Sequence, residues 1–194
     1  YKKNTKYKLT SMKRNSAVKA LYFKELKRYF SSVNYVMNTG IGAIMLTFSI
    51  FGIIIFGGEK VNAVLGIPGF SNVLNNLGPL VMGAFCLLTC TTGPSISLEG
   101  KNLWIIKSIP TKVKEIFYSK ILVNLTILIP TIIINSTVLS IYFKTSFITT
   151  IFMFITPFIY SLFISILGIV INLWFPNFTW KNEIKVIKQS MSTF

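Results

Sequence analysis

The sequence contains no histidine and no aspartate, and its acidic side chains are five glutamates. A Ser-His-Asp triad, a HExxH zinc site and a histidine-rich metal cage are therefore excluded for this chain. Charged residues make up 13% of the chain and hydrophobic residues 52%, whereas soluble proteins carry roughly 25% charged residues. We therefore expect a membrane protein with no catalytic residue and no metal site of its own.

Cysteine is also scarce. The two cysteines, Cys86 and Cys90, lie four residues apart in an apolar segment. On a helix this spacing places both thiols on one face, but its geometry is poor for a disulfide between them. We interpret them as two small residues buried in the membrane.

Charge is missing altogether from long stretches of the chain. Residues 35 to 98 contain only Glu59 and Lys60, and residues 121 to 180 contain only Lys144. A bilayer core of about 30 Å is crossed by roughly 20 apolar residues in a helix, and hydrocarbon requires every backbone group to be bonded internally. The sequence predicts an all-α integral membrane protein with four transmembrane helices over residues 35–57, 77–98, 121–143 and 148–174.

The positive charges predict how these spans are oriented. Ten Lys and Arg precede Tyr35, one lies between the first two spans, five lie in residues 99–120, one is Lys144, and three follow Trp174. Because cytoplasmic loops carry the excess of positive charge, both termini and the loop 99–120 are predicted to be cytoplasmic in a multi-pass protein of the cell membrane. Tyr35, Trp174 and Trp180 would be aromatic anchors at the inner interface. The formal net charge of +15 follows this pattern better than it indicates a nucleic-acid partner.

Residues 1–34 form a basic segment that contains a predicted amphipathic helix over residues 17–33. At 100° per residue its apolar side chains share one arc and its cations lie opposite, with Lys19 misplaced. A basic helix before a span usually lies in the membrane interface, but it can also couple a membrane domain to a moving partner. The apolar arc comprises Val18, Tyr22, Phe23, Leu26, Tyr29, Phe30 and Val33, and the opposite cations are Lys24, Lys27 and Arg28.

The cytoplasmic loop 99–120 holds more large apolar residues than a connector needs. Some of them are predicted to form the apolar side of a short helix that Pro110 ends, with Thr111 available to cap the next helix. Such a surface suits the lipid headgroup region or a pocket on a partner protein, and the residues leave both open. The residues of this apolar side are Leu103, Trp104, Ile106 and Ile109.

The spans also contain prolines, such as Pro130, and polar residues, such as Asn124. Polar and small side chains commonly hold membrane helices together, and proline permits kinks. We interpret these residues as helix packing rather than a substrate path, because no charged group lies inside any predicted span.

Three stretches resemble a known family. The segment 24–32, KELKRYFSS, before the first span is similar to the helix that leads into the membrane in permease subunits of type-2 ATP-binding-cassette exporters. The loop is similar to that family's acidic-Gly, Leu-rich, Pro and Lys-closed loop, and the tail 172–190 resembles a subset of such permeases from low-GC Gram-positive bacteria. The loop residues that match are Glu99, Gly100, Leu103, Trp104, Ile106, Ile109 and Pro110, followed by Lys114, Glu115, Ile116 and Lys120.

The resemblance implies a permease that exports a hydrophobic or amphipathic substrate as a dimer or pseudo-dimer. In that family the loop is a coupling helix seated on a nucleotide-binding subunit, so residues Glu99 to Pro110 would couple ATP hydrolysis to transport, and Leu26, Lys27, Arg28, Tyr29 and Phe30 would form the interfacial helix. The chain has no Walker-type sequence, which places ATP and Mg on the partner ATPase and makes this chain a transporter rather than an enzyme.

Two features depart from the family pattern. Trp104 and Lys107 stand where other members often have a Thr-Leu-Glu pattern, and four spans are predicted where the class usually has six. The start at Tyr1 and the apolar ending of the tail 175–194 indicate a piece of a longer polypeptide. The alternative function is a non-transporting membrane scaffold or assembly protein that docks a cytoplasmic partner. An intramembrane enzyme is disfavoured by the missing His and Asp.

Overall fold

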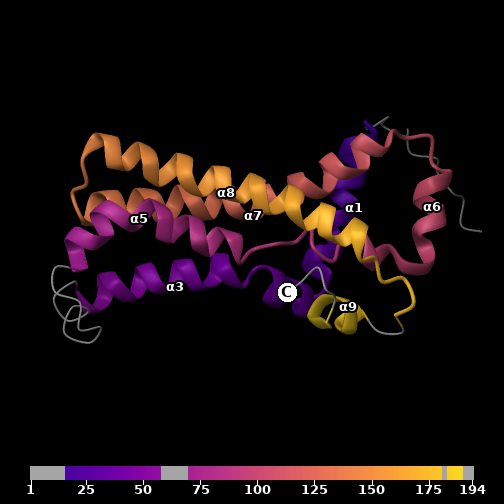
Figure 1. Ribbon diagram of the computed structural model, residues 1–194, viewed down its shortest axis with the longest axis horizontal. Helices are drawn as coiled ribbons and strands as arrows, with labels where there is room; N and C mark the ends of the chain where they lie inside the picture. Colours follow the sequence, from indigo (N-terminus) through magenta and orange to yellow (C-terminus); the bar gives the residue numbers. More distant parts are fainter. Residues whose placement is uncertain (1–15, 58–69, 181–182, 190–194) are drawn as a thin grey trace, which may run out of the picture.

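The computed structural model describes residues 16–57, 70–180 and 183–189, and all regular secondary structure in these ranges is helical. The predicted all-α class is therefore confirmed for the described part of the chain. The elements are α1 (Ala17–Ser31), α2 (Val33–Thr39), α3 (Ile41–Phe56), α5 (Phe70–Leu87), the 3-10 helix η1 (Ser97–Asn102), α6 (Leu103–Ser108), α7 (Val113–Tyr142), α8 (Phe147–Trp174) and α9 (Glu183–Gln189) (Figure 1).

Two of these helices, α7 and α8, are long and apolar enough to cross a membrane. They correspond to the predicted spans 121–143 and 148–174. The predicted first span, 35–57, is a bent pair, because α2 and α3 meet at an angle of 67° and count as a third candidate only if they form one broken span. The predicted second span, 77–98, differs from the structure, since α5 begins at Phe70 and already ends at Leu87.

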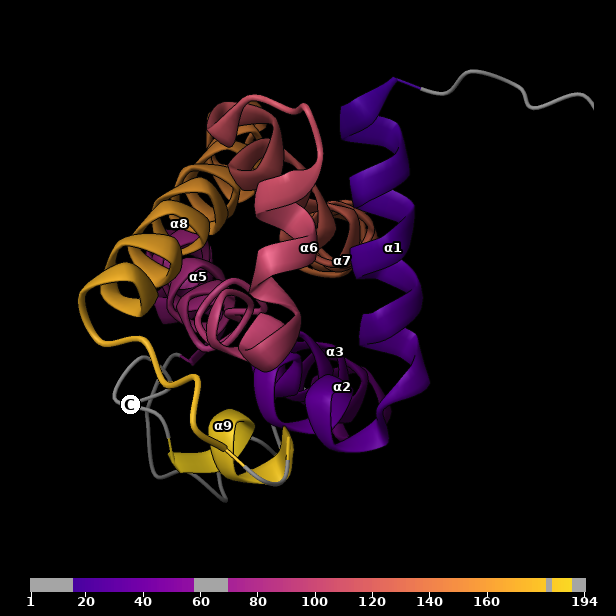
Figure 2. The same cartoon turned by 90° about the vertical axis from the view of Figure 1, so that its right-hand side faces the viewer.

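Four helices, α3, α5, α7 and α8, follow the long axis of the molecule, and α1 lies across them at one end (Figures 1 and 2). The helix α5 packs against α8, α8 packs against α7, and α3 contacts both α5 and α7. Within the bundle the core is formed by two apolar clusters. Its largest buried side chains include Met82, Leu128 and Met153. Cys86 and Cys90 are both free thiols, and Cys86 is buried in α5 as predicted. Cys90 differs from the prediction, because it is only half-buried and lies beyond the end of α5 at Leu87.

Local capping sets where α1 and α7 begin and end. The Ser16 hydroxyl accepts the Lys19 amide at the start of α1, and Ser32 separates α1 from α2, so the predicted helix 17–33 is broken one residue before its end. At α7 the cap is Lys112, whose amide donates to Glu115 Oε2 at 3.1 Å. The predicted cap, Thr111, is not used, and its buried hydroxyl has no hydrogen-bond partner among the described residues.

Candidate functional site

Residues 88–96, between α5 and η1, form an irregular segment. Burial begins within this segment and continues into η1, because every residue from 91 to 100 is buried. This segment replaces the second half of the predicted span 77–98. Its sequence contains the pair Gly93-Pro94, and proline supplies no amide to a helix and disfavours helical geometry in the residue before it. Irregular backbone inside an apolar domain is tolerated only where protein groups bond its amides and carbonyls.

Two asparagines from the candidate spans bond this irregular segment. Asn124 of α7 accepts both the amide and the hydroxyl of Thr91 at 3.0 Å. Asn172 of α8 accepts the amides of Ile96 and Ser97 at 2.9 Å each, and its own amide donates to the Ser97 hydroxyl at 2.8 Å. Both asparagines are fully buried. The irregular segment is therefore fastened to α7 and α8, which agrees with the interpretation of Asn124 as a packing residue.

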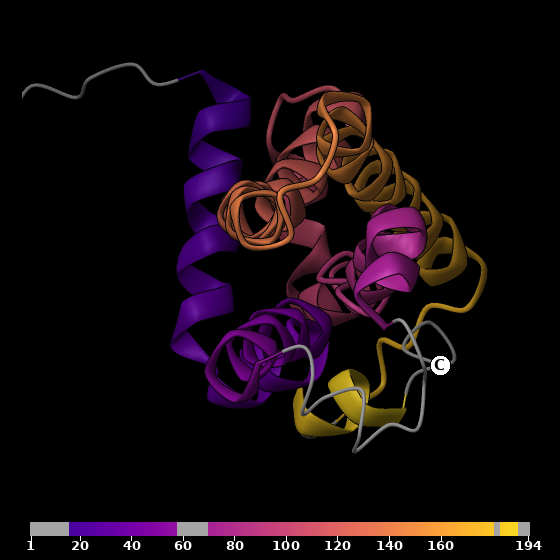
Figure 3. The ribbon, with the colours of Figure 1, turned by 90° about the vertical axis from the view of Figure 1, so that its left-hand side faces the viewer.

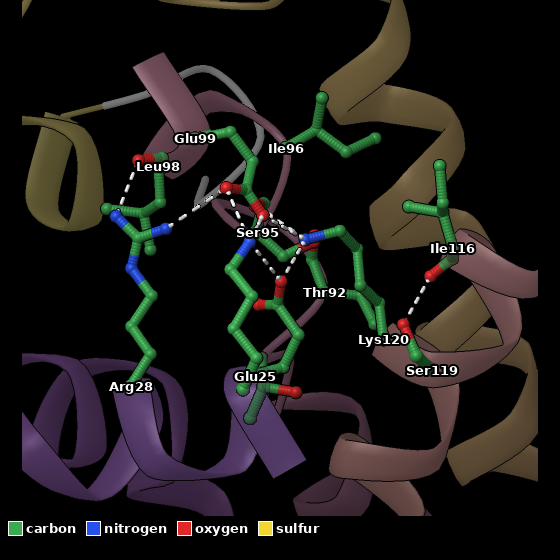
Figure 4. A network of polar contacts seen from close by, with 12 residues as sticks. Glu25, Arg28, Thr92, Ser95, Ile96, Leu98, Glu99, Ile116, Ser119 and Lys120 are labelled. Carbon is green, nitrogen blue, oxygen red and sulfur yellow. Dashed lines mark hydrogen bonds and ion pairs between the residues drawn. The ribbon is translucent and has the colours of Figure 1, made fainter. Parts of the chain in front are cut away.

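A buried ion network lies where α1, η1 and α7 meet (Figure 4). Lys120 of α7 contacts Glu25 of α1 at 3.0 Å and Glu99 of η1 at 3.2 Å, and its ammonium also donates to the Ser95 carbonyl at 3.0 Å. Lys24 of α1 reaches Glu99 at 2.9 Å. Glu25, Glu99 and Lys120 are only 6%, 4% and 3% exposed. Because unpaired charges are costly to bury, the three side chains depend on one another.

Arg28 extends the network to α9. Its guanidinium donates to the Leu98 carbonyl at 2.5 Å and to Glu183 of α9 at 3.0 Å, and it lies 3.7 Å from Glu99. The network therefore contains three cations and three of the four glutamates that the structure describes. It joins the first and last described helices to η1, at the base of the loop 99–120.

The two buried carboxyls have different electrostatic environments. Burial raises the pKa of Glu25 above its ordinary value of 4.5, and the attraction of Lys120 only partly offsets this effect. Burial acts in the same direction on Glu99, but Lys120, a hydrogen bond from Glu25 and Lys24 outweigh it and lower the pKa of Glu99 to about 2. The neighbouring ammonium groups therefore favour the ionised form of Glu99, whereas burial favours the neutral form of Glu25.

The predicted short helix of the loop is present as α6, and Pro110 follows its end. Its predicted single apolar side is divided between two directions. Ile106 is buried and Leu103 is half-buried, whereas Trp104 is 67% exposed and Ile109 is also exposed. The helix α6 lies at the far end of the molecule from the α7–α8 turn (Figures 1 and 2). One of its apolar surfaces thus fixes α6 to the protein, and the other is free.

Glu99 and Gly100, predicted as coupling residues together with α6, are inside the protein rather than on its surface. Gly100 has a positive φ of 50°, and a Cβ atom there would lie 2.8 Å from the Trp180 ring. Only glycine adopts this backbone readily and leaves room for the indole. These two residues can hold α6 in place, but they cannot form part of an exposed docking surface.

The tail after α8 folds back over η1. Trp180 Nε1 donates to the Ser97 carbonyl at 2.7 Å, and the Asn177 amide donates to the Ser97 hydroxyl at 2.9 Å. Val186 and Ile187 of α9 are buried with Tyr29, Tyr35 and Leu98. We call residues 175–180 and 183–187 the C-terminal clasp. Sequence reasoning missed it because the tail has no long apolar run.

The aromatic residues predicted to anchor the protein at the interface have different environments. Tyr35 is buried and its hydroxyl donates to the Thr91 carbonyl at 2.7 Å, and Trp180 belongs to the C-terminal clasp. Among the three, Trp174 is exposed as an anchor requires. The Tyr hydroxyl and the Trp indole N–H can donate a hydrogen bond to a carbonyl inside the protein as well as to polar groups at a membrane interface.

The predicted interfacial residues of α1 point in several directions. The buried stripe is Leu21, Glu25 and Tyr29, and it faces α7 and the clasp. Phe30 and Lys27 are exposed. Sequence reasoning missed this inward stripe because Glu25 lies among cations and looks like part of a solvated face. Of the remaining predicted residues, Leu26 is half-buried and Arg28 belongs to the ion network.

Comparisons with protein-family models, curated proteins and solved structures find no match to this chain. The resemblance to type-2 exporter permeases therefore rests on the loop, the N-terminal helix and the tail. In the described ranges, no three His, Cys, Asp or Glu side chains are grouped so that they could hold a metal ion.

Proposed function

We propose that this chain is the membrane-spanning permease component of an ATP-driven exporter, with α6 docked on a separate ATPase subunit that binds ATP and Mg. The observation that supports this proposal is the combination of an exposed Trp104 on α6 with a buried ion pair, Glu99 to Lys120, at the base of α6. The exposed indole is a docking element, and the ion pair joins it to a candidate span.

A displacement of α6 can be transmitted to the bundle through three contacts. Glu99 transmits it to α7 through its ion pair with Lys120 at 3.2 Å, and to α1 through its ion pair with Lys24 at 2.9 Å. Ser97, two residues before Glu99, transmits the displacement to α8 through its hydrogen bonds with Asn172. Because buried ion pairs and hydrogen-bonded networks keep a defined geometry, the displacement reaches the helices instead of being absorbed by a loose loop.

The surface around α6 indicates the chemistry of its partner. Trp104 and Ile109 offer an apolar contact, and Lys107, Lys112 and Lys114 are exposed on α6 and at the start of α7. The matching surface on the ATPase is an apolar pocket with acidic side chains at its rim. The cargo in this proposal is hydrophobic or amphipathic, and the working permease is a dimer or pseudo-dimer.

The exposed indole can be tested directly. Trp104→Ala is expected to weaken binding of the ATPase subunit by about 2 kcal/mol, roughly thirtyfold, because a large aromatic anchor leaves its pocket. Hydrolysis would also be uncoupled from export. The measurements are co-purification of the ATPase and export from reconstituted vesicles. Phe147→Ala is the control and should change neither, because it removes another well-exposed aromatic side chain, at the start of α8 and at the far end of the molecule from α6.

Two other outcomes have defined meanings. If Trp104→Ala leaves ATPase binding and export intact but detaches the loop from lipid, the coupling assignment is wrong and α6 is an interfacial anchor. If the variant loses a bound partner while the wild-type complex shows no ATP-dependent export, the chain is a scaffold that docks this partner.

The proposed orientation in the cell membrane places both termini and α6 in the cytoplasm and the α7–α8 turn outside. In a Cys86→Ser, Cys90→Ser background, Phe147→Cys should react with an impermeant thiol reagent in intact cells, and Val113→Cys should react only after permeabilisation. Both positions are well exposed at opposite ends of the candidate spans. The reverse labelling pattern would contradict the distribution of Lys and Arg on which the orientation rests.

A further inference from the structure

A groove of about 490 Å³ lies between α3 and α7 at the end of the bundle where α1 crosses it. Figure 3 shows α1 passing beside α7 and the α2–α3 pair. The volume of the groove is within the range of about 300–1,000 Å³ typical of small-molecule sites. The walls include Ile44 and Phe48 of α3 with Ile127 and Pro130 of α7, and α1 contributes Tyr29 and Phe30.

The groove offers hydrocarbon rather than hydrogen bonds. None of the described residues that line it is charged. Its three threonine hydroxyls donate to carbonyls of their own helices, Thr47 to Ala43, Thr126 to Leu122 and Thr131 to Ile127, at 2.7 to 2.9 Å. Their methyl groups are what remains for a ligand. A polar solute would lose hydration in this groove without replacement, whereas an alkyl chain loses nothing.

The bend between α2 and α3 forms one end of the groove. Gly40, which lines it, stands at the bend, and a Cβ atom there would lie 2.7 Å from both the Tyr29 hydroxyl and the Val36 carbonyl. The bend therefore requires glycine. The bend of the backbone thus shapes this end of the groove, and the groove is already open with the described side chains in their present positions.

Cations stand beside the groove. A neighbouring hollow of about 340 Å³ shares Thr126 with it and is lined by Lys19. Lys19 and Lys27 are exposed on α1, while the single acidic residue of that helix, Glu25, is buried in the ion network. The charges exposed on α1 are therefore all positive. Basic residues of a helix next to a bilayer attract anionic headgroups.

We propose that the α3–α7 groove binds one acyl chain of an anionic membrane phospholipid, whose headgroup lies against the cations of α1. This inference requires that α7 crosses a bilayer, but it does not depend on export or on an ATPase. The apolar lining of the groove favours an acyl chain, and Lys19 and Lys27 favour a negatively charged headgroup. The groove is a lipid site next to the ion network that connects α1 to η1, the helix before α6.

Native mass spectrometry of the full chain in detergent tests the proposal with phosphatidylglycerol and phosphatidylcholine of identical acyl chains. The wild-type protein should retain one phosphatidylglycerol at a detergent concentration that removes phosphatidylcholine. Thr131→Trp and Ile44→Trp, which fill the groove from opposite walls, should each lower retention about tenfold. Ile141→Trp places the same indole on an exposed part of α7 outside the groove and should retain lipid as the wild type does.

The two parts of the proposal can be overturned separately. Wild-type retention in both filled variants, with unfolding temperatures like that of Ile141→Trp, would show that the groove is not the site. Equal retention of the two lipids by the wild type would exclude recognition of the headgroup charge. The double variant Lys19→Gln, Lys27→Gln should abolish the preference for phosphatidylglycerol, and an unchanged preference would remove α1 from the site.

Discussion

Replacing Lys120 by methionine is expected to lower the free energy of unfolding by about 3–5 kcal/mol, because it removes the buried ammonium between two buried carboxyls and leaves them with the exposed Lys24 as their shared cation. Lys120 is bonded to Glu25, Glu99 and the Ser95 carbonyl, and its side chain is almost fully enclosed. Methionine has a similar length, so the loss is one of charge and hydrogen bonds more than of volume. Equilibrium unfolding in mixed micelles of mild detergent and SDS measures the effect.

Three further variants distinguish the ion network from a general effect of losing a lysine. Lys114→Met, at an exposed position near the start of α7, should change stability by less than about 0.5 kcal/mol. The triple variant Lys120→Met, Glu25→Gln, Glu99→Gln should recover much of the loss, since no buried charge is then unpaired. Glu25→Gln alone should be mild, because burial already disfavours its charge. A Lys120→Met protein as stable as Lys114→Met would contradict this account of the network.

Replacing Asn172 by alanine is expected to cost at least about 2 kcal/mol of stability, because two buried backbone amides, those of Ile96 and Ser97, lose their acceptor. The same change removes the donor to the Ser97 hydroxyl. Loss of this link should loosen η1 and α6 more than the bundle. Hydrogen exchange of residues 97–108 should therefore accelerate before that of α7 does.

Asn38→Ala is the matched control, since Asn38 is exposed on α2 and, among the residues that the structure describes, its side chain bonds the Asn34 carbonyl of its own helix and no other group. It should leave both stability and exchange close to the wild-type values. If Asn172→Ala shows equally small changes, the irregular segment is held by other contacts, and Asn172 does not position the base of α6.

The predictions that were confirmed are those that depend on local composition. Long uncharged runs identified α7 and α8, and the spacing of apolar residues before Pro110 identified α6. The same reasoning extended the second span to residue 98, where α5 ends at Leu87. Hydropathy assigns Thr and Gly intermediate values and counts Cys as apolar, so it did not detect that Thr89 to Pro94 leave the helix. The asparagines that satisfy their backbone come from other helices.

The environment of charged and aromatic residues was harder to predict than the helices. Glu99 was assigned to a docking surface, yet it is buried and contacts Lys120. Trp180 was assigned to the membrane interface, yet it is half-buried and donates to the Ser97 carbonyl of η1. A single side chain can satisfy its charge or N–H in water, at a membrane or against a distant residue. Nothing in its sequence neighbours distinguishes these three environments.

The sequence by itself determined the helical class, the two candidate spans, the α6 helix and the concentration of positive charge in a few segments. These properties are sums over contiguous residues, so distant contacts are not needed to obtain them. Only the tertiary structure decided that Glu25 meets Lys120 across 95 positions, that Lys24 meets Glu99 across 75, and that Asn172 bonds residues 76 and 75 positions away. The physical reason is that a buried charge or amide is stable only with a partner, and packing of the helices decides which partner comes within reach.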